Sequence, residues 1–336
     1  MKADARPQTY WSSNQVKAAI LLAAVVVVLF IIPEFATPYQ VLLLTYGLVM
    51  AIAALGFNLL LGYTGLLSFG HSAYFGTGAY AVALTVKYLS VSSMEVFVVL
   101  GVVASALISA FFGLICVRHT RIFFAVLAMA LSQVLWTLVY KFYWVTNGTD
   151  GLNIPFPTLL GGLFEFSGAG AYPRFISSYY YYVAGIFCIT TALMWLIVHS
   201  PFGQTLQAIR DNEIRAEFIG IKVRLYRWIA FLISGTFTGL AGVLWIPLNR
   251  HVTPEVLHWP FSGEIVFMTV LGGFKSFSGP IIGAIAFNYL KTYAIAWTEY
   301  WQFLLGFVLV VIVLALPTGI AGFAELLAGD LRKKKG

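Results

Sequence analysis

The stretch VLLLTYGLVMAIAALGFNLLL at residues 41–61 decides the fold, because it is long, apolar and free of charged side chains. A helix needs about 20 mostly apolar residues to cross the hydrocarbon core of a bilayer, and this stretch has that length. A transmembrane strand would instead alternate between apolar and polar residues. The stretch therefore predicts a membrane-spanning helix.

The composition of the whole chain agrees with this interpretation. Of the 336 residues, 60% are apolar and 10% are charged, whereas a typical soluble domain has about 25% charged residues. A chain this apolar lacks the polar side chains that cover the surface of a soluble enzyme. Its aromatic content of 16% also excludes a disordered protein.

Ten apolar runs occur along the chain, and they predict an all-α fold: a polytopic helical membrane protein with about ten transmembrane helices. The runs are Ala18–Ile32, Val41–Leu61, Phe69–Val86, Val96–Val117, Ile122–Tyr140, Tyr179–Val198, Trp228–Leu248, Ile265–Phe274, Pro280–Trp297 and Phe303–Pro317. They place the membrane domain at residues 18–320, between a tail at 1–17 and a basic tail at 321–336. No small-residue cleavage site follows the first run, so we interpret it as a signal anchor rather than a cleaved signal peptide.

The distribution of Lys and Arg predicts the orientation, because cytoplasmic loops of membrane proteins carry an excess of these residues. With ten spans both termini lie on the same side, and that side collects most of the 20 basic residues. Both tails are therefore expected in the cytoplasm. The basic residues are spread over several loops at the membrane edge, so the net charge of +7 does not indicate a nucleic-acid partner.

Charged and catalytic groups are sparse in the runs. None of the 13 acidic residues lies in the middle of a run, which argues against a proton- or sodium-driven carrier, because such carriers use intramembrane carboxylates. Lys291 lies inside the ninth run and is expected to extend towards the membrane surface.

We find no cluster of metal-ligating residues and no grouping of catalytic residues. A GxxxxGK[ST] loop is also missing, so any ATP site must belong to another chain and no cofactor is expected on this one.

Two glycine-rich breaks interrupt the runs, at residues 62–71 (GYTGLLSFGH) and 272–280 (GGFKSFSGP). Broken helices are tolerated in membranes where they are buried in protein or line a wet cavity, and in transporters they mark substrate sites or gates. Close helix packing is the alternative for each single glycine. The candidate pathway residues are Gly62, Gly65, Ser68, Gly70, His71, Gly272, Gly273 and Gly279. On the pathway interpretation, valine at Gly65 or Gly272 should abolish uptake while assembly persists.

The longest predicted cytoplasmic loop, residues 199–227, contains a short amphipathic helix. Ser200 is a suitable N-cap, Pro201 suits the first turn, and Gly220 ends the segment. Asp211 and Arg215 are four residues apart and could form an ion pair. Because charges of both signs are present, a protein partner fits this helix better than an anionic membrane. On the other side of the membrane, the tyrosines that follow the loop at 144–178 are expected to form an interfacial belt.

Taken together, several segments resemble the permease subunits of branched-chain amino acid ABC transporters of the LivM type. The segments are residues 62–85 (GYTGLLSFGHSAYFGTGAYAVALT), 146–152 (TNGTDGL), 199–227 (HSPFGQTLQAIRDNEIRAEFIGIKVRLYR), 231–244 (FLISGTFTGLAGVL) and 271–284 (LGGFKSFSGPIIGA). The resemblance covers about residues 40–320. It implies a multi-pass protein of the bacterial inner membrane that imports branched-chain amino acids.

The resemblance also implies partners: a second, homologous permease subunit, two ATP-binding cassette subunits that hold the ATP, and an extracytoplasmic substrate-binding protein, all at a lipid membrane. The segment at 199–227 would be the one that docks on the ATPase. The residues that the resemblance assigns to coupling are Arg210, Asp211, Asn212, Glu213, Ala216, Glu217 and Gly220. Ile214 stands where the family pattern EAA-x-x-x-G has its Glu, and Glu213 comes one residue earlier.

Other functions are left open by the sequence. Within the same family, urea or amides are the nearest rival substrates. A stand-alone channel or secondary carrier would work without an ATPase, but the missing membrane carboxylates and the charged cytoplasmic helix argue against it. A membrane-embedded enzyme would need a catalytic cluster at the membrane edge, and the sequence contains none that we recognise.

Overall fold

The structure, a computed structural model, describes residues 29–166, 168, 170–316 and 318–323. These residues are mostly helical, which confirms the helical fold class. The one sheet among them is a two-stranded antiparallel pair of β1 (Leu152–Asn153) and β2 (His251–Val252). The predicted tail at 1–17, nearly all of the tail at 321–336 and most of the first apolar run lie outside the described residues.

Six of the described helices are long and apolar enough to cross a membrane, which confirms a polytopic helical membrane protein. They are Pro38–Thr64, Met94–Cys116, Ile122–Lys141, Ala171–His199, Val223–Asn249 and Trp301–Phe323. The expected number of about ten spans is not confirmed. Among the remaining helices, α3 (His71–Leu89) and α12 (Gly279–Trp297) are less apolar, and α11 (Trp259–Gly272) is shorter.

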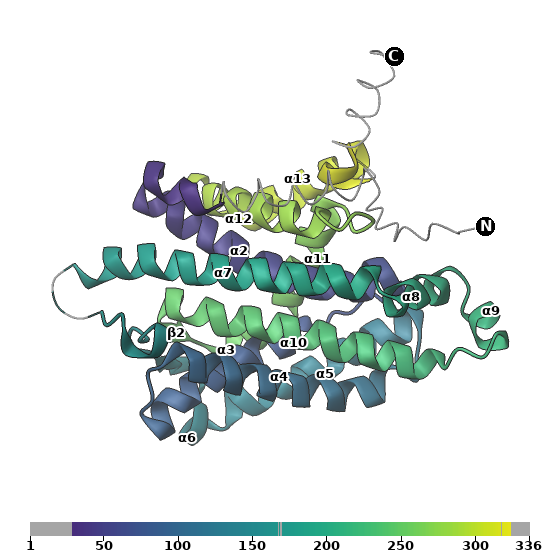
Figure 1. Cartoon of the computed structure of the whole chain (residues 1–336), viewed down its shortest axis with the longest axis horizontal. Helices are drawn as coiled ribbons and strands as arrows, with labels where there is room; N and C mark the ends of the chain where they lie inside the picture. Colours follow the sequence, from purple (N-terminus) through teal and green to yellow (C-terminus); the bar gives the residue numbers. More distant parts are fainter. Residues whose placement is uncertain (1–28, 167, 169, 317, 324–336) are drawn as a thin grey trace, which may run out of the picture.

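Most of the helices run along the long axis of one bundle (Figure 1). α2 (Pro38–Asn58) lies at its centre and packs against α7 (Ala171–His199), α10 (Val223–Asn249), α11 and α12. Its residues are almost all buried from Val41 onwards, which explains why this stretch is apolar on every side. The sequence at 41–61 therefore becomes the helix around which the others pack.

The outer helices cover this core on both sides. α10 packs against α3 and α4 (Met94–Cys116), and α5 (Arg121–Lys141) contacts both of these helices. α13 (Trp301–Ala315) packs against α11 and α12 on the opposite side of the bundle. Many large apolar side chains of α4, α5 and α13 are exposed, as expected for helix faces that meet lipid.

The two ends of the bundle differ (Figure 1). One end carries α8 (Pro201–Asp211) and α9 (Glu213–Phe218), and α9 projects beyond the long helices. The opposite end carries the small sheet together with four short helical turns. These turns are α6 (Tyr143–Thr146), η2 (Gly148–Asp150), η3 (Leu160–Gly162) and η4 (Pro254–Leu257).

The tyrosines at the start of the sixth apolar run do not all form an interfacial belt. α7 begins at Ala171, well before that run, so Tyr179 and Tyr180 lie inside the bundle and are fully buried. The Tyr179 hydroxyl donates a 2.8 Å hydrogen bond to the carbonyl oxygen of Leu244, and Tyr180 donates one of 2.6 Å to that of Leu29. For these two residues the prediction was wrong, because the helix extends further than the apolar run.

Candidate functional site

The two glycine-rich breaks lie against each other near the end of the bundle that carries α8. α2 continues into η1 (Leu59–Thr64), a π-helical turn that ends at Gly65. Glycine has no Cβ atom. If Gly62 carried one, it would lie 2.5 Å from the carbonyl oxygen of Phe274, in the loop between α11 and α12. The backbones of the two breaks are therefore in direct contact. The sequence did not predict that they meet.

Arg210 of α8 reaches into the first break. Its Nη1 donates a hydrogen bond to the carbonyl oxygen of Gly62, one of the carbonyls near a helix end that lack a helical partner. The Cγ of Arg210 also packs against Gly65, at 2.9 Å from where a Cβ on that residue would lie. The backbone of Gly65 has a φ of +71°, which favours glycine. Arg210 Nη2 also lies 3.2 Å from Asp211 Oδ1. One predicted coupling residue thus contacts two predicted pathway residues.

The coupling segment forms two helices, whereas the sequence predicted one. Asn212 is extended (φ −159°, ψ 101°) and separates α8 from α9. Its side-chain Oδ1 accepts a 2.9 Å hydrogen bond from the backbone N–H of Arg215, so Asn212 is the N-cap of α9. The predicted ion pair between Asp211 and Arg215 was wrong, because the helical spacing is broken between them. Asp211 pairs with Arg210 instead.

α9 is tied to α10 by a double hydrogen bond between charged groups. Arg227 donates from Nη1 and Nη2 to the two carboxylate oxygens of Glu213, at 2.6 and 2.8 Å. The Arg227 side chain is only 6% exposed. Of the other predicted coupling residues, Ala216 is buried, Glu217 is exposed and Gly220 has a φ of +89°. Arg227 was not among the predicted residues, although its position in the resembling segment could have indicated it.

Replacing Glu213 with glutamine should destabilise the protein by about 2 kcal/mol, because it leaves the Arg227 guanidinium buried without its counter-charge. We place the effect below the range for fully buried pairs, since the Glu213 side chain is 37% exposed. Thermal melting of the purified protein measures it. Glu217→Gln on the same helix is the control, and equal melting temperatures for the two variants would contradict this role of the ion pair.

The remainder of the first break faces other helices. Ser68 Oγ accepts a 3.3 Å hydrogen bond from the backbone N–H of Gly70, and a Cβ on Gly70 would lie 2.5 Å from the carbonyl oxygen of Ala128 in α5. His71 is the first residue of α3, fully buried, with Nε2 2.8 Å from Ser234 Oγ in α10. Gly70 and His71 therefore sit at contacts with other helices, and Ser68 bonds within the break.

The glycines of the second break form a close backbone crossing. A Cβ on Gly272 would collide with the carbonyl oxygen of Gly279, and one on Gly279 would collide with that of Gly273. Gly273 has a φ of +104° and lies against the backbone of Thr318. For these three residues the geometry agrees with the packing interpretation. Their predicted role in the pathway stays a prediction.

Comparison with known proteins identifies the kind of protein to which this geometry belongs. A family model described as the permease component of branched-chain amino acid transport systems matches residues 39–313. The chain belongs to this family. It is therefore a membrane permease component, as the resemblance of its segments indicated. No solved structure matches the chain.

Curated relatives of this permease align over most of its length. The high-affinity branched-chain amino acid transport system permease protein LivM of Escherichia coli K12 is 26% identical, over 91% of this chain and 76% of its own length. The permease protein LivH of Salmonella typhimurium is 23% identical, over 84% of this chain and 94% of its own length. BraD of Pseudomonas aeruginosa is 24% identical over the same shares.

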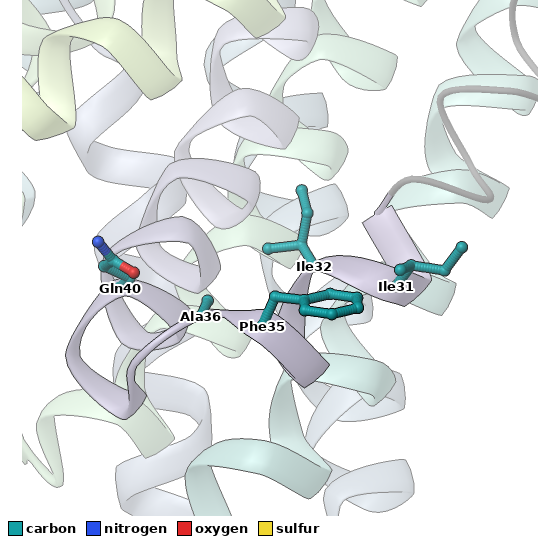
Figure 2. Close-up of a pocket in the computed structure, with 5 residues that line it drawn as sticks. All are labelled: Ile31, Ile32, Phe35, Ala36 and Gln40. Atoms are coloured by element: carbon teal, nitrogen blue, oxygen red, sulfur yellow. The ribbon is translucent and has the colours of Figure 1, made fainter.

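The hollow in Figure 2 does not coincide with the breaks of this permease. It is open and apolar, and it lies beside the start of α2. Its lining residues are Ile31, Ile32, Phe35, Ala36 and Gln40. None of the predicted site residues lines it. Within the described part of the chain, no group of three or more His, Cys, Asp or Glu residues lies together as a metal site.

An ion pair inside the helices of the permease was not predicted. Lys291 Nζ of α12 lies 2.6 and 2.7 Å from the two carboxylate oxygens of Glu264 in α11. The expectation that Lys291 extends to the surface was wrong, because its Nζ pairs with Glu264 instead. Glu264 was expected at the edge of an apolar run, but α11 begins at Trp259 and so includes it. Pro260 in its first turn is the sequence signal that could have shown this earlier start.

Proposed function

We propose that this chain is the permease subunit of an ATP-driven importer for branched-chain amino acids. Family membership and the printed names of the relatives support this substrate class. In this proposal a second, homologous permease completes the membrane part, and two ATP-binding cassette subunits hydrolyse the ATP. This chain itself carries out no catalysis and holds no cofactor.

The observation that carries the proposal is the contact between Arg210 and the first glycine break. A displacement of α8 pulls directly on the carbonyl of Gly62 and on the backbone at Gly65. The π-helical turn there has a less regular hydrogen-bond pattern than an α-helix, as is common at functional positions. Because the second break touches Gly62, a movement of η1 also displaces the loop before α12. ATP binding on a partner would thus alter the end of the bundle where both breaks meet.

The surface of α9 supports an ATPase partner at this end. Ile214 is 66% exposed and Phe218 is 86% exposed, and Glu217 lies between them in the sequence. Apolar side chains that project from a charged segment beyond the bundle are typical of a protein-binding surface. The residues assigned to coupling, Arg210 to Gly220, therefore have two tasks in this proposal: α9 docks on the ATPase, and α8 transmits its movement.

The proposal also fixes an orientation. The end of the bundle with α8 and α9 faces the cytoplasm, and both termini lie on that side of the bacterial inner membrane. The opposite end, with the small sheet and the turns η2 to η4, then faces an extracytoplasmic binding protein that delivers the substrate. The excess of Lys and Arg on the α8 side supports this orientation.

Purification of the tagged chain from its native membrane in mild detergent, with mass spectrometry of the proteins that accompany it, tests the partners. The expected result is a complex that also contains a second permease and two ATP-binding cassette subunits. These two subunits can be different chains or two copies of the same chain. The assembled complex in liposomes should then take up radiolabelled leucine only with ATP and the binding protein. Uptake of urea or amides in place of leucine would reassign the substrate, and ATP-independent transport by the chain alone would establish a channel or carrier.

A further inference from the structure

The ion pair between Glu264 and Lys291 joins α11 and α12 between the loop at 273–278 and the far ends of the two helices. Glu264 is five residues after the first residue of α11, and Lys291 is six residues before the last residue of α12. At 1.5 Å of rise per residue, both lie about 8 Å inside those helix ends. These ends are remote from the loop at 273–278, and in the proposed orientation they are the extracytoplasmic ends.

The surroundings of the pair do not resemble a lipid-facing surface. The side chain of Lys291 is 28% exposed and that of Glu264 is 23% exposed, so both are half-buried and still accessible. Glu264 shares one stripe of α11 with Pro260 and Phe267, which are exposed. Ionisable side chains within membrane helices almost always face the bundle interior or a water-filled cavity. The stripe therefore faces water or a partner subunit.

The ion pair is not needed to close the helical hairpin of α11 and α12. Those helices are already joined at their other end by the backbone crossing of Gly272 with Gly279 and Gly283. A partly buried ion pair contributes little net stability, because the loss of hydration offsets the attraction between the charges. Its presence in a membrane helix pair, where charges are costly, therefore indicates a task other than packing.

We propose that Glu264 and Lys291 bind the zwitterionic head of the amino acid substrate, an assignment that rests on the proposed function. The ammonium group of the substrate takes the place of Lys291 beside the Glu264 carboxylate, and its carboxylate accepts hydrogen bonds from Lys291 Nζ. One ion pair is exchanged for two, and the net charge of the site stays at zero. A simple cation or anion would leave one charge unbalanced, which is costly away from bulk water.

The neighbouring rings match a substrate with an apolar side chain. Phe267 is 47% exposed and lies one turn from Glu264 on the same stripe. The face of Trp301 lies 5.6 Å from Lys291 Nζ, at the start of α13. An aliphatic side chain that packs against one of these rings would be partly removed from water while its charged head stays paired. The site thus combines the two chemical features of a branched-chain amino acid.

The test is the double variant E264Q/K291Q in the complete importer, reconstituted with its ATPase subunits and binding protein. The variant leaves no unpaired charge, so assembly should persist, whereas leucine uptake per assembled complex should fall at least about tenfold, since two charge-assisted hydrogen bonds to the substrate are lost. Tyr293→Phe on α12, an exposed residue, is the control and should transport as the wild type does. Wild-type uptake by the double variant would overturn the assignment while the proposed function stands. A wild-type importer that moves no amino acid would overturn both.

A labelling experiment keeps the assignment testable even when the double variant does not assemble. Phe267→Cys should react with a charged methanethiosulfonate reagent added to membranes that hold the complex, because a site that admits the substrate must be open to water. Val126→Cys on α5, 59% exposed on an outer helix, should remain unreactive as a lipid-facing control. The unsubstituted chain shows the background from Cys116 and Cys188. Failure of Phe267→Cys to react would overturn the assignment.

Discussion

Replacing Arg210 with alanine is expected to reduce leucine uptake strongly while the assembled importer continues to hydrolyse ATP. The variant removes the charge-assisted hydrogen bond from Nη1 to the carbonyl of Gly62 and the packing of Cγ against Gly65. Such a hydrogen bond contributes about 2 kcal/mol, and coupling between two sites is itself a free energy of this size. Uptake per ATP hydrolysed should therefore fall at least about tenfold.

The control for this experiment is Arg224→Ala, which removes an exposed arginine from the first turn of α10. It changes the charge of the same cytoplasmic face without touching either break. Both variants are measured in liposomes with the binding protein present, as leucine uptake and as phosphate release. An Arg210→Ala importer that retains the wild-type ratio of uptake to hydrolysis would show that α8 does not act through the first break.

The sequence predicts the class of the fold because apolar runs depend only on local composition. The run at 41–61 became the central helix α2, and the segment at 199–227 became the helices α8 and α9 at one end of the bundle. Their bounds were less accurate. In the sequence, Asn212 is equally consistent with a position inside a helix and with a helix cap. Only the structure shows that α8 ends and α9 begins at this residue.

The contacts between distant segments could not be predicted from local patterns. The approach of Gly62 to Phe274 joins two breaks that are far apart in the sequence, and each break alone is consistent with either packing or a gate. The pairing of Lys291 with Glu264 also depends on how α11 and α12 cross. A hydropathy run ends at a charged residue even where the helix continues, and this is why Glu264 was placed at the edge of a run and not inside the helix.

Substitution of Gly272 with alanine is expected to prevent assembly, which separates this residue from Gly65. The sequence alone suggested the same outcome for valine at both positions, namely lost uptake with assembly intact. In the structure, a Cβ on Gly272 would collide with the carbonyl oxygen of Gly279 and lie 2.8 Å from the backbone nitrogen of Gly283. Backbone atoms on two packed helices cannot move aside as a flexible side chain can, so the cost should reach about 3 kcal/mol or more. Gly65 instead faces the stem of Arg210, which can shift.

Gly263→Ala is the matched control, because it makes the same chemical change in the same helix. A Cβ at Gly263 would have no heavy atom within 4 Å, and alanine favours a helix over glycine by about 0.5–1 kcal/mol. The yield of assembled complex and its melting temperature should therefore be unchanged or higher for Gly263→Ala and much lower for Gly272→Ala. If Gly272→Ala assembles normally and loses only uptake, the crossing of α11 and α12 is a moving part of the pathway and not a fixed contact. The interpretation of the second break as close packing would then be replaced by the gate that the sequence left open.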